Sequence, residues 1–110
     1  MQPRVELEPG EGNFGSRTAD QIARVMRSRV GVFRACYAKE VAKRKSLRGK
    51  IVVRFEINPP GVVTKASLAS STLKSEAVET CVVTQIKRLK FPAADEPSVV
   101  SYPFVFVDSD

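Results

Sequence analysis

The chain has 110 residues, 43% of them hydrophobic, which suits one domain with a single modest core. It contains no histidine, so the Ser-His and Cys-His pairs of nucleophilic catalysis are excluded, and its net charge of +6 invites a polyanionic partner. No apolar run approaches the roughly 18 residues of a membrane span, and residues 1–3 lack the apolar stretch of a signal peptide.

Residues 1–17 are predicted to form a flexible linker or arm. The segment shows no sustained hydrophobic period and is rich in residues that interrupt helices and strands, namely Pro3, Pro9, Gly10, Gly12 and Gly15. Regular structure is expected to begin near Thr18. We therefore assign the folded domain to residues 18–108.

A long amphipathic helix is predicted to start after Thr18 and to end near Lys43. Thr18 and Gln21 have the spacing of a capping box, in which each side chain accepts a hydrogen bond from the other residue's backbone N–H. Apolar residues then recur at helical spacing and define one stripe: Ile22, Val25, Met26, Val30, Phe33, Cys36, Tyr37 and Val41. The opposite side carries a basic face formed by Arg24, Arg27 and Arg34.

Arg29 lies inside the apolar arc of this helix rather than beside it. Its guanidinium must therefore extend along the helix into solvent, pair with a carboxylate such as Glu76 or Glu79, or face a partner. Extension into solvent is the ordinary behaviour of such a side chain.

Three strands and a second helix are expected in the rest of the chain. Residues 50–57 alternate between apolar and polar side chains, residues 58–61 (Asn-Pro-Pro-Gly) form a turn, and residues 62–70 return beside the first strand. The second helix begins near Ser75 and ends before Pro92. The third strand, residues 99–107, contains a proline that suits an edge position.

These elements predict an α+β fold with the order α-β-β-α-β. Each helix has one apolar stripe, so both helices should cover one face of a three-stranded antiparallel sheet. The second helix joins two strands that run parallel to each other, and the compact solution places the first strand between them, in the order 2-1-3. The third strand is then expected to be an open edge.

Cys36 and Cys81 fall on the apolar sides of the two predicted helices. Without histidine to complete a metal site, an even pair of cysteines favours a disulfide, which implies an oxidising compartment. The alternative is two separate buried thiols that behave as small hydrophobic residues. A disulfide without an export signal suggests a piece of a longer protein, whose upstream part carries the membrane anchor or signal.

No residue set in the sequence supports catalysis, a metal site or a cofactor. Ser70-Ser71-Thr72 has no accompanying base and no glycine-rich run before it, so a turn is the simpler interpretation. Nucleic-acid binding is the alternative function, because basic residues concentrate at Lys43-Arg44-Lys45. However, Phe55, Phe104 and Phe106 lie on faces expected to be buried, which leaves few side chains for base stacking.

The chain also resembles a known family over residues 22–107. Cys36-Tyr37, a second cysteine at Cys81, Phe91-Pro92 and Tyr102-Pro103-Phe104 follow one another as in the TonB C-terminal domain superfamily. Within that superfamily the chain resembles the AgmX/PglI-type C-terminal domain of myxobacterial gliding-motility envelope proteins. Further residues that carry the resemblance are Gly49 to Phe55, Ile57, Gly61-Val62-Val63 and Ser70-Ser71.

The resemblance implies a non-enzymatic periplasmic domain of an inner-membrane protein, which couples a proton-driven motor to an outer-membrane or other envelope protein. TonB-like domains bind a partner segment by adding a strand to the sheet edge. The residues expected to bind are therefore those of the third strand: Val99, Val100, Ser101, Tyr102, Pro103, Phe104, Val105, Phe106 and Val107. The basic face of Arg24, Arg27 and Arg34 is the second expected surface, with no metal and no cofactor.

Overall fold

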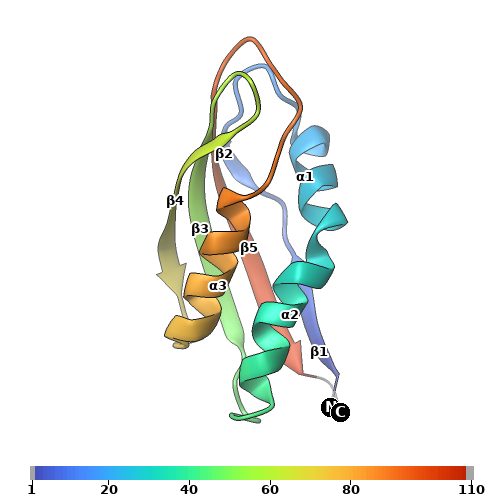
Figure 1. The fold of residues 1–110 in the computed structure, drawn as a ribbon, viewed down its shortest axis with the longest axis vertical. Helices are drawn as coiled ribbons and strands as arrows, with labels where there is room; N and C mark the ends of the chain where they lie inside the picture. The colour runs from blue at the N-terminus through green and yellow to red at the C-terminus, as the bar shows by residue number, and fades with distance from the viewer. Residues whose placement is uncertain (1, 109–110) are drawn as a thin grey trace.

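Three helices lie on one face of a five-stranded antiparallel sheet in the computed structural model, which describes residues 2–108 (Figure 1). The elements in chain order are β1 (Pro3–Leu7), β2 (Glu11–Asn13), α1 (Ala19–Ser28), α2 (Val30–Val41), β3 (Gly49–Ile57), β4 (Val63–Ser71), α3 (Glu76–Lys87) and β5 (Ser98–Asp108). The sheet order is β1-β5-β3-β4, and β2 also pairs with β5. None of the helices in the described part is long and apolar enough to span a bilayer.

The predicted α+β class is confirmed, and the three expected strands lie in the predicted mutual order, β4-β3-β5. The strand number and the helix number were both wrong. The sheet gains β1 and β2 from the segment predicted to be a linker, and the first predicted helix is divided into α1 and α2.

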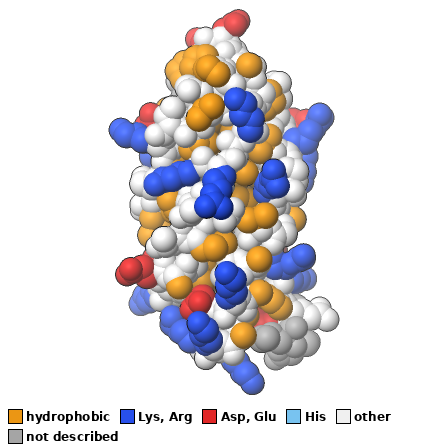
Figure 2. All heavy atoms as spheres, viewed as in Figure 1, with side chains coloured by type: hydrophobic (Ala, Val, Ile, Leu, Met, Phe, Trp, Pro, Cys, Tyr) orange, Lys and Arg blue, Asp and Glu red, His pale blue; other side chains and the backbone are white. Residues whose placement is uncertain are grey.

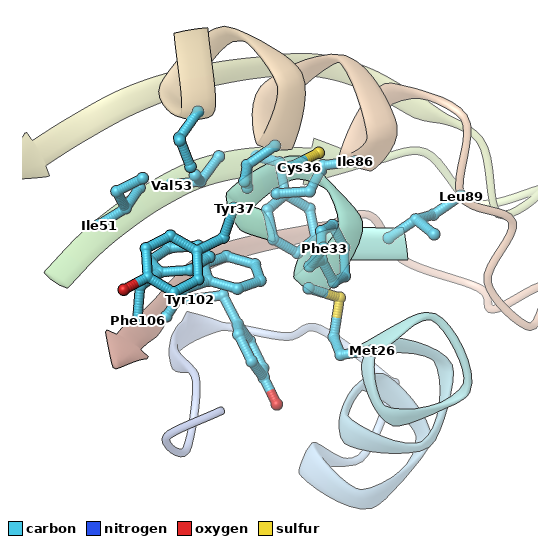
Figure 3. Packing of buried hydrophobic residues seen from close by; sticks show 14 of the residues in the cluster. Met26, Phe33, Cys36, Tyr37, Ile51, Val53, Ile86, Leu89, Tyr102 and Phe106 are labelled. Carbon is cyan, nitrogen blue, oxygen red and sulfur yellow. The ribbon is translucent and has the colours of Figure 1, made fainter. Parts of the chain in front are cut away.

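The core lies between the sheet and the helices, where alternate residues of β3 and β5 are buried (Figure 3). The Phe33 ring from α2 meets the Phe104 ring of β5 edge-on, with ring centroids 4.9 Å apart. Beside this pair, the Tyr37 hydroxyl donates a hydrogen bond to the backbone oxygen of Leu47. α2 is therefore fixed to the sheet by aromatic packing along β5.

The first predicted helix breaks at Arg29, where the backbone adopts φ −116° and ψ 12°. Directly before the break, the Ser28 hydroxyl donates a 2.6 Å hydrogen bond to the Val25 carbonyl oxygen, a bond that competes with the helical pattern. Gly31 follows in the first turn of α2 and adds no helical preference. The apolar stripe runs on through the break, which is why periodicity alone predicted one helix.

The N-terminal arm, defined as residues 2–13, is not a free linker. β1 pairs with the C-terminal half of β5, from Pro3 opposite Asp108 to Leu7 opposite Phe104. β2 pairs with the N-terminal half, with Glu11 opposite Ser101. Val5 and Leu7 pack against the core from this edge. The arm is ordered because it satisfies the backbone donors and acceptors on the outer side of β5.

Pro103 explains why the arm forms two short strands instead of one. The Glu8 backbone N–H donates to the Pro103 carbonyl oxygen at 3.2 Å, so the backbone polar groups of Pro103 are turned toward the arm. Proline has no N–H to return. Pairing therefore stops after Glu8 and resumes at Glu11, while the other side of β5 keeps an unbroken register with β3.

Arg17 joins the end of the arm to two loops and was not singled out by the sequence pattern. The residue is 4% exposed. Its guanidinium donates to the carbonyl oxygens of Pro92 at 2.8 Å and Asn58 at 2.9 Å, and to the Ser98 hydroxyl at 2.9 Å. Burial lowers the pKa of Arg17 below its ordinary value. Oxygen acceptors from several segments thus compensate for burying this charge.

Candidate interaction surfaces

A disulfide between Cys36 and Cys81 links α2 to α3, as predicted. The S–S distance is 2.04 Å and the two Cα atoms are 5.7 Å apart, which is an ordinary separation for a bridged pair. Cys36 is buried and Cys81 is partly buried against the same core. The bridge lies on the helical side of the sheet and leaves both sheet edges untouched.

β5 is not the open edge that was expected to bind a partner strand. β3 pairs with it on one side, from Gly49 opposite Phe106 to Ile57 opposite Ser98, and the arm pairs with it on the other. Of the predicted binding residues, four point into the core: Val100, Tyr102, Phe104 and Phe106. The other five are half-buried on the face without helices: Val99, Ser101, Pro103, Val105 and Val107.

β4 is an edge strand of this sheet, because it pairs with β3 on one side only. The Thr72 backbone N–H donates to the Lys50 carbonyl oxygen at 2.8 Å, which sets the alternation of the ladder. From the register, the polar backbone groups of Ala66 and Leu68 turn away from β3. They are therefore available to an additional strand.

Two register shifts bound this free segment. One lies beside Val52 and Val53, opposite residues 68–70, and the other lies between Glu56 and Ile57, opposite residues 63–65. Bulges of this kind bend an edge strand and restrict pairing with other chains. The edge can therefore pair over a short segment, centred on residues 66–68.

Leu68 is 40% exposed, and the cavity beside it lies against the outer side of α3. The cavity has a volume of about 250 Å3 and is lined by Leu68, Glu79, Thr80, Val83, Thr84 and Lys87. Glu79 also accepts a 2.6 Å hydrogen bond from the Ser71 hydroxyl, which joins α3 to the end of β4. A strand added to β4 would lay every second side chain over this cavity.

The three arginines of the predicted basic face do not form one surface. Arg24 and Arg27 on α1 are drawn to Asp20, with closest nitrogen–oxygen distances of 2.9 and 3.8 Å. Arg34 lies beyond the helix break and lines a separate cavity with Arg4 of the arm. The prediction of one basic face assumed one continuous helix. The break at residue 29 separates Arg34 from Arg24 and Arg27.

A larger hollow of about 730 Å3 lies between the arm and α1. Its lining includes Leu7, Pro9, Ala23, Arg27 and Tyr102. Burial raises the pKa of the Tyr102 hydroxyl, and the charge of Arg27 lowers it in part. Sequence reasoning missed this hollow because it required the arm to be folded.

Within residues 2–108 no three Asp, Glu or Cys side chains gather closely enough to hold a metal ion. The surface features described above are the unpaired side of β4 and the cavities beside α3 and between the arm and α1. Comparison of the chain with protein-family models, curated proteins and solved structures found no match.

Proposed function

We propose that this chain is a non-enzymatic interaction domain of the cell envelope, which binds an extended segment of a partner by adding a strand to β4. The parent protein would be anchored in the inner membrane, and the domain would act in the periplasm. It would connect a proton-driven motor to an outer-membrane or periplasmic protein of a motility complex. The resemblance to TonB-like domains supports this assignment, and the disulfide supports an oxidising compartment.

The observation that carries the proposal is the free outer side of β4 beside an apolar cavity. Backbone groups of Ala66 and Leu68 supply hydrogen bonds that do not depend on the partner's sequence. The cavity next to Leu68 and Val83 supplies side-chain selectivity. Together they favour a short extended segment that carries an apolar residue at its centre.

The aromatic side chains argue against the nucleic-acid alternative. Seven of the eight aromatic residues are buried, and the eighth is half-buried: Phe33, Tyr37, Phe55, Phe91, Tyr102, Phe104 and Phe106 in the first group, and Phe14 in the second. The helix-free face of the sheet presents small, aliphatic and charged side chains instead, such as Val52, Arg54 and Ser101. Single-stranded nucleic acids are usually held by aromatic side chains that stack on the bases, so this face lacks the usual platform.

The proposal can be tested by capturing partners from a solubilised envelope fraction with the oxidised chain and its variants. Leu68→Pro removes the outward N–H and should weaken capture about tenfold, since an edge strand relies on such bonds. Leu68→Ala keeps the backbone and should lose only the side-chain contribution. The partner segment, once made as a peptide, should protect the amides of Ala66 and Leu68 from hydrogen exchange.

Three results would contradict the proposal. Capture that is unchanged by Leu68→Pro would exclude the β4 edge. Exchange protection confined to another surface would place the binding site elsewhere. Retention of oligonucleotides with affinity that falls steeply with salt would favour the nucleic-acid alternative.

A further inference from the structure

We infer that Arg29 and Arg88 form a second binding site, which takes a pair of acidic side chains from a peptide segment. The two residues line one cavity of about 200 Å3 between the helix break and the end of α3. This site shares no lining residue with the cavity beside β4, so it can be tested independently of the proposed function.

The fold brings these two arginines together from distant parts of the chain. Arg29 occupies the break between α1 and α2, and Arg88 is the residue at which α3 ends. The disulfide between Cys36 and Cys81 holds α2 against α3. The backbone positions from which the two arginines extend are thus constrained by a covalent link between α2 and α3.

Neither arginine has an anionic partner within the described residues. Salt bridges there occupy other cations, including Arg24, Arg54 and Lys50. Of the partners considered for Arg29 from the sequence, Glu79 instead accepts from Ser71. Both arginines are exposed, as is the neighbouring Lys87. Figure 2 shows that Lys and Arg side chains are spread over this helical face.

The cavity lining mixes apolar and polar atoms, which distinguishes the site from a plain basic patch. Phe33, Val32 and Leu89 line it together with the Gln85 amide, and the arginines complete the lining. A single side chain of moderate size fits a volume of about 200 Å3. The chemistry therefore matches an apolar residue flanked by two carboxylates, which the guanidinium groups can bind through paired hydrogen bonds.

An acidic peptide fits this site better than a nucleic acid does. A nucleic acid needs a track of several phosphate contacts and exposed rings on which its bases can stack. Here two arginines flank one small cavity, and the ring that lines it belongs to Phe33, which is fully buried. A base could not stack on a ring in that position.

The inference can be tested with a fluorescein-labelled peptide of sequence Gly-Glu-Phe-Glu-Gly, acetylated at its N-terminus. Binding to the oxidised chain should be measured by fluorescence anisotropy at several salt concentrations. The double substitution Arg29→Gln and Arg88→Gln should raise Kd at least about tenfold, because both charge-assisted contacts are lost. Arg34→Gln removes one charge, as Arg29→Gln alone does, but from an exposed position of α2 outside the cavity, and should change Kd less than about twofold.

Replacing both glutamates of the peptide by glutamine should abolish binding if the carboxylates are recognised. Replacing its phenylalanine by alanine should weaken binding, because contact with the apolar atoms of Val32 and Leu89 is lost. A loss with Arg34→Gln equal to that with Arg29→Gln alone would mean that only overall charge attracts the peptide, and this would overturn the site. Absence of peptide binding would overturn it too, as would tighter binding of an oligothymidine that carries equal charge. None of these results depends on Leu68 or on the β4 edge.

Discussion

The disulfide-linked helices and the N-terminal arm are attached to the same sheet by different forces. α2 and α3 are joined covalently through Cys36 and Cys81 and bury large side chains against β3 and β5. The arm contributes mainly backbone hydrogen bonds, with Val5 and Leu7 half-buried at its inner side. The helices should therefore resist local opening, while the arm should open with little effect on the rest.

The largest expected effect is the loss of the disulfide. Cys36→Ser opens a loop with a sequence separation of 45, and the entropy gained by the unfolded chain should lower the free energy of unfolding by roughly 4 kcal/mol. Urea unfolding in oxidising buffer measures this change. Addition of a reductant to the parent chain should bring it to the stability of the variant. Equal stability of both chains in oxidising buffer would show that the helices do not depend on the bridge.

The next largest effect is expected at Arg17, which connects the end of the arm with the loops around Asn58 and Pro92. Arg17→Met fills part of the volume but leaves buried carbonyl oxygens without donors. We expect a loss of about 3 kcal/mol in the free energy of unfolding. Arg17→Lys should recover only part of it, since one ammonium cannot reach all of the acceptors. A loss below about 1 kcal/mol would mean that water replaces the guanidinium.

The difference between the helices and the arm also explains which elements could be predicted from the sequence. Helices and central strands bury alternate or periodic side chains, so Phe33, Cys36 and Phe104 marked their elements by spacing alone. The break at Arg29 did not change the spacing of the apolar residues. It is marked only by the Ser28 hydroxyl bond and by the backbone conformation of Arg29, which the hydrophobic pattern does not report.

The arm and the candidate site were beyond prediction for a related reason. Glu11–Asn13 is fully exposed and carries no apolar residue, so only the bare outer side of β5 makes it a strand. Because the arm covers β5, the edges of the sheet are the arm on one side and β4 on the other. β4 was an edge in the predicted order too, but its exposed side chains gave an irregular pattern that did not mark it as a binding strand. The disulfide was predictable from the spacing of the cysteines. The choice of β5 as the binding edge was wrong because residues 1–17 were predicted to be a linker and were left out of the sheet.

A smaller effect, confined to the arm, is expected from Val105→Pro. Val105 is two residues from Pro103, so its backbone N–H also faces the arm, opposite Glu6. The substitution should cost about 1 kcal/mol for the lost bond and should free the arm first. Hydrogen exchange should accelerate at Arg4 and Glu6, while Val53 of β3 stays protected. Faster exchange throughout β3 would show that the arm and the core open together.

The smallest expected effect comes from an ion pair that links the arm to the sheet. The Lys50 ammonium of β3 lies 3.0 Å from a carboxylate oxygen of Glu8, and both side chains are nearly half exposed. Lys50→Gln should lower the free energy of unfolding by roughly 0.5 kcal/mol, since solvent screens exposed pairs. A double-mutant cycle with Glu8→Gln isolates the coupling between the two charges. The coupling should vanish at about 1 M salt, where the Debye length is only about 3 Å. A coupling that persists at high salt would show that side-chain contacts at this point stabilise the arm in addition to backbone pairing. The arm and the helices would then differ less in how they are attached to the sheet.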